Sequence, residues 1–466
     1  FQKYFFNYIN DCIACGADGF RYDTAKHIGL TDDPKEDDGF ENNFWEKATK
    51  KVDNAENLFI YGEVLQGDND RLADYIKEIG RTTSSTYGSK IRSGLAGGNI
   101  DTAVVSDYWI GSADPNIVTW VESHDNYIND GTYNNIDSEQ VILGWAIIAA
   151  RKDGTPLFFD RPYNSTIDNY WGMNRIGTQG DDMYKDDRVS AVNFFRTAMK
   201  GEDENLVNPN LDSSALMIER GTKGAVIVNT NDALKVDFET NLADGTYVDR
   251  VDRKTEYTVK NGKITCEKDI PENSVVVLYN EGYTEYARPA CVGVDSKTEF
   301  TYSDDTYEVT LTCSNTDNAT YSLDGAKTVS YKNGDKVTIK HGDSDVSKLE
   351  LRAENAEGVK TYERVEFTYK KEYVTKEGTK VYFTKPDSDD WDDEIYAYVY
   401  TDAGDENADW PGIEMKKEKD GTYSYTIERD LNSPYIIFND GDASDSQQYP
   451  EGQGLEVVPD KNYTVE

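Results

Sequence analysis

Residues 19–27 read Gly-Phe-Arg-Tyr-Asp-Thr-Ala-Lys-His and place four chemically active side chains close together: Arg21, Asp23, Lys26 and His27. An arginine, a carboxylate, a lysine and a histidine at this density indicate a site. Apolar and polar residues alternate at the start of this run, which predicts a short buried strand followed by a polar loop at its carboxyl end. In a parallel α/β barrel, catalytic groups lie on that rim.

Two further segments repeat this layout of an apolar strand followed by an acid. Residues 58–63 end on Glu63, and residues 117–125 end on His124 and Asp125. Segments of helical composition lie between the strands, at residues 43–54 and 70–79. Strand and helix therefore alternate as parallel βα units require, which predicts that three carboxylates converge on one rim.

The motifs GFRYDTAKH at 19–27, GEVLQ at 62–66 and VESHDN at 121–126 resemble those of the α-amylase family, glycoside hydrolase family thirteen. A fourth segment, residues 154–162 (GTPLFFDRP), resembles the last barrel strand of the saccharifying bacterial α-amylases in particular. The resemblance implies an α/β fold. It would be a partial (β/α)8 TIM barrel, about strands four to eight, followed by all-β sandwich domains.

The resemblance also implies the catalytic roles. Retaining hydrolysis of a glycosidic bond needs one carboxylate that attacks the anomeric carbon and a second carboxyl group, roughly 5 Å away, that protonates the leaving oxygen. Asp23 would be the nucleophile and Glu63 the general acid and then base. Asp125 would hydrogen-bond sugar hydroxyls, so that the distorted transition state is bound better than the ground state.

The remaining polar residues of the motifs would support this chemistry. Arg21 lies two residues before Asp23, on the same face of the strand, where its charge-assisted hydrogen bonds would hold the nucleophile ionised. Lys26, His27 and His124 would line the sugar subsites.

Each acid has a simpler interpretation, because an Asp or Glu at a strand end is often a turn residue or a helix cap. The constellation of three motifs favours the catalytic interpretation. Asp18 and Glu122 point to the other face of their strands and are predicted to be structural. His341 lies outside the motifs and is predicted to be a surface loop residue.

The chain divides into four predicted domains. Residues 1–200 would form the C-terminal half of the barrel, and residues 201–281 resemble the β-sandwich that follows the barrel in α-amylases. Residues 283–370 show strand-like alternation and predict an immunoglobulin-like β spacer without a ligand. Within it, Cys291 and Cys313 could form a disulfide in a secreted protein. Residues 376–466 form the last module.

The aromatic residues of the last module indicate sugar binding. Tyr396 and Tyr398 are two residues apart and so share a face of a strand, and Trp410 is flanked by Asp409 and Pro411. Exposed rings stack on the flat C–H faces of sugars. The module resembles starch-binding modules of carbohydrate-binding family twenty-six. In the alternative interpretation these aromatic residues pack the core of a small sandwich.

Composition restricts the partners. The 88 acidic and 49 basic residues give a formal net charge of −39, which disfavours nucleic acid and anionic membranes and leaves a neutral polymer as the natural partner. No apolar run is long enough to span a membrane. We expect a monomer that binds starch and maltooligosaccharides.

The chain starts within a helical pattern and without Met. By resemblance, three barrel strands and a signal peptide would lie upstream, so the sequence is interpreted as part of an extracellular, secreted protein. The resemblance also implies a structural calcium, to which this chain would contribute the main-chain carbonyl of His27. We expect the chain alone to be inactive.

Three function classes remain for this chain. The first is an endo-acting α-1,4-glucan hydrolase, the second a non-catalytic starch-binding protein, and the third a transglycosylase or debranching enzyme on the same scaffold. The Asp-Arg-Pro sequence after the last strand and the starch module favour the hydrolase.

Overall fold

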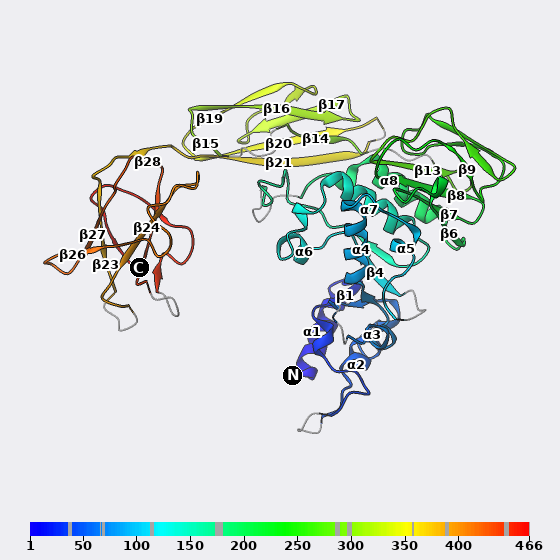
Figure 1. Cartoon of the computed structure of the whole chain (residues 1–466), viewed down its shortest axis with the longest axis horizontal. Coiled ribbons are helices and arrows are strands. Elements are labelled where there is room, and N and C mark those ends of the chain that lie inside the picture. Colours follow the sequence, from blue (N-terminus) through cyan, green and yellow to red (C-terminus); the bar gives the residue numbers. More distant parts are fainter. Residues whose placement is uncertain are drawn as a thin grey trace. The chain divides into compact units, whose positions relative to one another are not determined.

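The computed structural model describes residues 1–35, 40–65, 67, 70–111, 116–172, 180–284, 289–295, 301–356, 358–386, 391–441 and 447–465. The chain forms two compact units (Figure 1). The first covers residues 1–300, 308–337 and 348–365, and the second covers residues 301–307, 338–347 and 366–466. No helix in the described part of the chain is long and apolar enough to cross a membrane.

A five-stranded parallel sheet organises the amino-terminal part of the first unit. Its strands are β1 (Gly19–Tyr22), β2 (Phe59–Gly62), β3 (Thr82–Thr83), β4 (Ile117–Trp120) and β5 (Thr155–Leu157). They pair in the order in which they occur in the chain, each parallel to the next. The predicted α/β class is confirmed, whereas the assignment to barrel strands four to eight stays a prediction.

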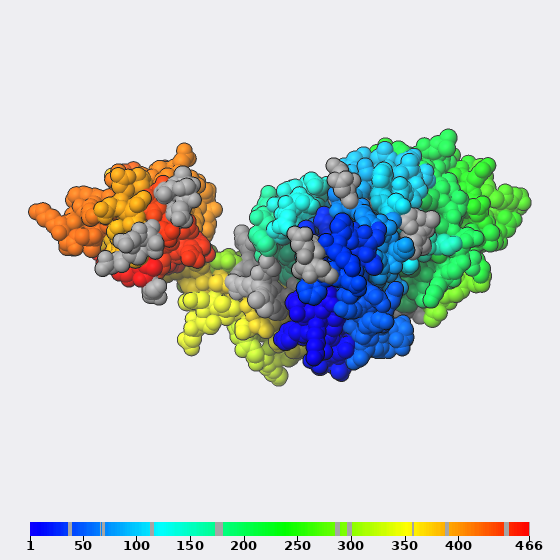
Figure 2. All heavy atoms as spheres, turned by 90° about the horizontal axis from the view of Figure 1, so that it is seen from below, coloured from blue at the N-terminus to red at the C-terminus, as the bar shows by residue number. Residues whose placement is uncertain are grey.

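Helices connect these strands. They are α1 (Gln2–Ala14), α2 (Phe44–Lys50), α3 (Leu72–Ile79), α4 (Ser85–Ala96), α5 (Thr102–Val105), α6 (His124–Ile128), α7 (Ser138–Ala150) and α8 (Asp187–Ala198), with short 3-10 turns η1 (Ala25–His27), η2 (Ala55–Asn57), η3 (Thr132–Asn134), η4 (Met183–Lys185) and η5 (Pro209–Leu211). In the space-filling view the blue segment, which includes α1 to α3, and the light-blue and cyan segments that follow form one continuous body (Figure 2).

Helix α7 is the central helix of this unit. It begins with a capping box, in which the Asp137 side chain accepts from the Gln140 amide and the Gln140 side chain accepts from the Asp137 amide. All of residues 141–150 are buried. The helix contacts α8 on one side and strands of the sheet and of the following sandwich on others, so it joins the two parts in one core.

The sandwich after α8 has two antiparallel sheets. One has the order β13-β8-β7-β6 and the other β10-β11-β12-β9. Their strands are β6 (Glu204–Val207), β7 (Ala215–Arg220), β8 (Gly224–Asn229), β9 (Asp237–Glu239), β10 (Gly245–Val248), β11 (Glu256–Lys260), β12 (Lys263–Thr265) and β13 (Ser274–Tyr279). Leu216 and Ile218 pack toward α7 while Ala215 and Met217 pack toward the second sheet, since side chains alternate along a strand.

Residues 291–369 form two further sheets, of order β14-β16-β19 and β15-β21-β20-β17-β18. The strands are β14 (Cys291–Val294), β15 (Thr301–Tyr302), β16 (Thr306–Ser314), β17 (Asn318–Leu323), β18 (Val329–Tyr331), β19 (Lys336–Lys340), β20 (Val346–Glu354) and β21 (Lys360–Tyr369). The immunoglobulin-like assignment and the predicted domain boundaries stay predictions.

The disulfide considered for this segment does not form, because Cys291 and Cys313 are free thiols. Cys291 lies opposite Ser314, and Val292 lies opposite Cys313. Residues that face each other across an antiparallel pair share a side of the sheet, so the two thiols point to opposite sides.

The second unit contains the carboxyl-terminal β module with its own core. Its sheets have the orders β26-β27-β23-β32, β25-β24-β29-β30 with β31 on β29, and β22-β28. The strands are β22 (Val374–Thr375), β23 (Lys380–Thr384), β24 (Tyr396–Tyr400), β25 (Ile413–Glu414), β26 (Lys416–Lys417), β27 (Tyr423–Thr426), β28 (Leu431–Asn432), β29 (Tyr435–Asn439), β30 (Gln448–Tyr449), β31 (Leu455–Glu456) and β32 (Asn462–Thr464).

Candidate active site

The side chains that follow β1 and β2 meet at one edge of the sheet. Tyr22 lies opposite Gly62, so Asp23 and Glu63 leave their strands as neighbours. The Arg21 guanidinium reaches both acids. Its Nη1 donates to Asp23 Oδ1 at 2.6 Å, and its Nη2 lies 3.9 Å from Glu63 Oε1. One positive charge therefore lies against two carboxylates, of which the sequence predicted the contact with Asp23.

The two carboxylates differ in their surroundings. Glu63 is buried, with 4% of its surface exposed, and its Oε2 accepts from the Thr24 amide at 2.9 Å. The preceding Gly62 allows this close packing, because a Cβ there would lie 2.7 Å from Ile79 Cδ1 and 2.9 Å from Ala25 Cβ. The Asp23 side chain is 67% exposed. Glu63 is held in place on several sides, whereas Asp23 is held by Arg21.

A second pair of predicted residues opens α6, directly after β4. The Ser123 side chain accepts from the Asn126 amide, and the Asn126 side chain accepts from the Ser123 amide. This capping box fixes the first turn of the helix, which carries His124 and Asp125. His124 Nε2 lies 3.6 Å from Asp125 Oδ2.

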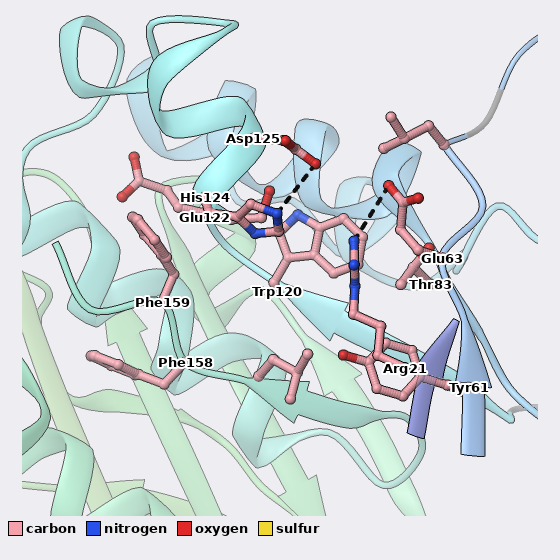
Figure 3. A pocket seen from close by; sticks show the side chains of 13 residues that line it. Arg21, Tyr61, Glu63, Thr83, Trp120, Glu122, His124, Asp125, Phe158 and Phe159 are labelled. Carbon is pink, nitrogen blue, oxygen red and sulfur yellow. Dashed lines mark ion pairs between the residues drawn. The ribbon is translucent and has the colours of Figure 1, made fainter. Parts of the chain in front are cut away.

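Arg21, Glu63, His124 and Asp125 line one cavity of about 160 Å³ at the carboxyl ends of the strands. In Figure 3 the Arg21 side chain extends toward Glu63, and dashed lines mark the ion pairs of Arg21 with Glu63 and of His124 with Asp125. The chain thus brings together four of the predicted residues that come from three different strands.

Several residues of the cavity wall were not predicted from the sequence. These are Tyr61, Thr83, Trp120, Phe158 and Phe159. Each lies at or next to the carboxyl end of a strand, and that position is the signal that could have found them. Burial raises the pKa of the Tyr61 hydroxyl, so this group stays a neutral hydrogen-bond donor beside Arg21 and Glu63.

Asp23, Lys26 and His27 are not among the residues that line the cavity. The Lys26 ammonium donates to the Leu65 carbonyl at 2.6 Å and to Asp70 Oδ2 at 3.1 Å, so it holds the loop after β2. His27 is exposed at the end of η1. Gln66, the last residue of the second motif, lies outside the described residues. Sugar binding by Lys26 and His27 stays a prediction.

Glu122 has the predicted structural role. Its carboxylate accepts two hydrogen bonds from the Arg161 guanidinium, each 2.8 Å long, and one from the Thr132 hydroxyl. Both charged side chains are nearly inaccessible to solvent. This buried pair joins the end of β4 to the segment that follows β5, and so supports two sides of the cavity.

The carboxyl-terminal module carries an exposed aromatic surface. Tyr396 and Tyr398 lie on one face of β24 and are half-buried, whereas Trp410 is 47% exposed. The Tyr398 and Trp410 ring centroids are 5.4 Å apart. These rings lie outside the core cluster of the module, which contains Trp391 instead. The interpretation of all these aromatic residues as core is therefore wrong for Trp410.

The structural calcium stays a prediction. Among the residues that the structure describes, no group of three or more His, Cys, Asp and Glu side chains could hold a metal ion. The predicted contribution of His27 is a single main-chain carbonyl, which does not make a site by itself.

An α/β sheet with acids gathered at the carboxyl ends of its strands, followed by β domains and an aromatic β module, is the arrangement that the motifs predict. Comparison with known proteins gives the particular relatives. The chain is homologous to α-amylases along nearly its whole length, and residues 381–453 match the family model described as starch-binding module 26.

Two relatives are α-amylases of bacteria. That of Butyrivibrio fibrisolvens is 36% identical over 494 aligned positions, which cover 95% of this chain and 48% of the relative. That of Clostridium acetobutylicum is 37% identical over 276 positions, which cover 59% of this chain and 34% of the relative. A solved α-amylase structure from H. orenii matches with a TM-score of 0.44 and 16% identity, covering 60% of this chain and 64% of that one. The chain spans half or less of the length of the two relatives.

Proposed function

We propose that this chain is part of an endo-acting retaining hydrolase of α-1,4-glucosidic bonds in starch and related glucans. The observation that carries the proposal is the contact of one guanidinium, that of Arg21, with both Asp23 and Glu63. The shared guanidinium keeps the two acids near each other, and retaining glycosidases need a pair of carboxyl groups roughly 5 Å apart, whereas inverting enzymes keep them further apart to admit a water.

The surroundings of the three acids fit different roles. Glu63 is buried and lines the cavity, so it protonates the leaving oxygen and then activates water. Asp23 attacks the anomeric carbon, and Arg21 orients its carboxylate. Asp125, which lines the same cavity as Glu63, binds sugar hydroxyls and favours the distorted ring.

The stereochemistry of the first turnover tests this mechanism. With the full-length parent protein and a maltooligosaccharide in an NMR tube, the newly released reducing end should be the α-anomer before mutarotation. A β-anomer would overturn the retaining mechanism.

The module of residues 376–466 binds starch and maltooligosaccharides through Tyr396, Tyr398 and Trp410. The match to the starch-binding family and the exposure of Trp410 support this part of the proposal. Transglycosylation and debranching use the same carboxylates, and they are distinguished by the products: a hydrolase releases short linear oligosaccharides from amylose without lengthening any chain.

The place of action and the cofactor are also proposals. Because starch is too large to enter a cell, we place the parent protein outside the cell, where it should be found in culture medium and not in cell extract. A structural calcium that involves the His27 carbonyl is tested by chelation, which should lower the melting temperature of the parent protein.

A further inference from the structure

A chain of aromatic contacts leads outward from the wall of the candidate active site. Phe159, which lines the cavity, packs on Tyr127 with ring centroids 5.5 Å apart, and Tyr127 packs on Tyr133 at 5.6 Å. Tyr133 and Tyr170 are stacked almost in parallel, with centroids 4.3 Å apart and an angle of 10°. Trp171 follows, 5.4 Å from Tyr170. The cluster thus runs from the cavity to the surface.

The inner end of this cluster is fixed in place. Tyr127 is 1% exposed, and its hydroxyl donates to the Tyr170 carbonyl at 2.8 Å. The segment that carries Tyr170 is also held by turns, since the Thr166 and Gly172 amides both donate to the Asn169 carbonyl at 3.0 Å. The outer rings therefore sit on a support that extends back to α6, the helix that carries Asp125.

The outer end is open to solvent. Trp171 is 44% exposed, whereas Trp45, Trp120 and Trp145 of the same unit are between 1% and 8% exposed. Burial in a core therefore does not explain the presence of a large apolar ring at this position. An exposed ring on a rigid support is the arrangement in which an aromatic side chain loses little conformational freedom when a ligand stacks on it.

We propose that Trp171, backed by the stacked rings of Tyr170 and Tyr133, is an outer sugar-binding platform of the candidate active site. It stacks on the C–H face of a glucose unit in a glucan chain that lies across the cavity. The platform rests on the proposed function, since the cavity supplies the cleavage point. Because the platform lies beyond the cavity, only chains long enough to reach it gain from it.

The matched control is Trp109, a tryptophan of similar exposure, 40%, in the same unit. It lies in the segment between α5 and β4, and the aromatic cluster that runs from Phe159 to Trp171 does not include it. The Lys90 ammonium lies 5.0 Å from the centroid of its ring. Replacement of Trp109 removes the same kind of exposed aromatic ring without touching the proposed platform.

The experiment uses the full-length parent protein with Trp410→Ala in every variant, so that the starch module does not mask the effect. The ratio of kcat/KM for maltoheptaose to kcat/KM for a chromogenic maltotrioside is measured. In Trp171→Ala this ratio should fall about tenfold, in the range of single aromatic stacking contacts. In Trp171→Tyr, which keeps an aromatic ring, the ratio should fall less. In Trp109→Ala the ratio should equal that of the protein with Trp410→Ala alone.

A direct binding measurement separates this proposal from the proposed function. Maltoheptaose is titrated calorimetrically into the same proteins. If the parent does not cleave glucans but Trp171→Ala weakens maltoheptaose binding about tenfold, the platform stands and the hydrolase assignment fails. If Trp171→Ala changes neither the ratio nor the affinity, or lowers activity equally on both substrates, the platform is overturned. An unchanged ratio together with loss of self-association would assign the ring to a protein contact.

Discussion

Because Arg21 contacts both Asp23 and Glu63, the replacement of a single acid should strongly lower catalysis. Asp23→Asn in the full-length parent keeps the shape of the side chain but removes the nucleophile. We expect starch turnover to fall by about 10⁴-fold or more, with polymer binding retained. Reducing-sugar release measures the turnover. The matched control is Asp18→Asn, an exposed acid just before the same strand, which should keep parental activity. A comparable loss in both variants would contradict the assignment of Asp23.

At the residue scale, Trp410 gives the second prediction. Trp410→Ala should weaken starch binding by about 1–3 kcal/mol, because a half-exposed ring stacks on sugar much as such rings stack on bases. Affinity electrophoresis of the module in a starch gel measures the effect. The control is Tyr382→Ala, since Tyr382 is a partly buried aromatic residue on the other sheet of the module. Equal migration of Trp410→Ala and the unmodified module would contradict the prediction.

Residues whose signal is local could be predicted from the sequence. Asp23, Glu63 and Asp125 each stand at the end of a short segment that begins with a strand-like pattern, so residue type and position can be recognised in a few letters. The part of the cavity wall that Trp120 and Phe158 form could not be predicted from the sequence, because it arises only when β4 and β5 pair. Trp171 was not visible either, since its exposure depends on the tertiary structure.

At the scale of elements, a buried ion pair joins η4 to β21 in the first unit. Lys185 Nζ lies 2.6 Å from Glu363 Oε1, and both side chains are nearly inaccessible. Lys185→Met leaves Glu363 without its partner, which should lower the free energy of unfolding by about 3 kcal/mol. Lys152→Met removes an exposed pair with Asp203 and should cost less than about 1 kcal/mol. Urea denaturation measures the free energy of unfolding of both variants, and equal losses in the two would contradict the prediction.

Asp160, which follows β5, should make the free energy of unfolding depend on pH. Burial, together with the nearby Asp181 and Asp182, raises the pKa of its carboxyl group to about 7. Between pH 4 and pH 7 the unfolded chain therefore loses this proton while the folded chain keeps it. The stabilisation from the protonated Asp160 carboxyl group is fully present below the pKa of this group in the unfolded chain, and it is lost as pH rises through 7. The free energy of unfolding should therefore fall from pH 4 toward pH 8.

Asp160→Asn tests this dependence. The variant should be more stable than the parent at pH 8 by on the order of 2 kcal/mol, because solvent screens part of the shift in a partly buried group. At pH 4 the two should be equal. Burial also raises the pKa of Glu363 to about 7, so a shallower dependence of the same sign should remain. Urea titrations at both pH values measure the difference, and a variant less stable at pH 8 would contradict the sign.

Elements with strong local chemistry could be predicted from the sequence. The turn at Asn261-Gly262 joins β11 to β12 as a two-residue hairpin loop, and both residues have positive φ, 53° and 75°. The apolar run 141–150 is the buried part of α7. The relation of Cys291 to Cys313 could not be predicted, because it depends on the register of two strands.

For the whole molecule, the parallel sheet of the described residues is open, with β1 and β5 at its edges. Asp23 follows an edge strand, its side chain is 67% exposed, and the cavity is lined without it. Misplacement of a reacting group by about 1 Å can cost a hundredfold in rate. We therefore expect purified residues 1–466 to cleave starch at least about 100-fold more slowly than the parent protein. Reducing-sugar release measures this, with Glu63→Gln as the control for contaminating activity. If residues 1–466 turn over starch near the parental rate and Glu63→Gln abolishes this activity, the prediction is contradicted. The five parallel strands would then hold Asp23 and Glu63 well enough for the reaction.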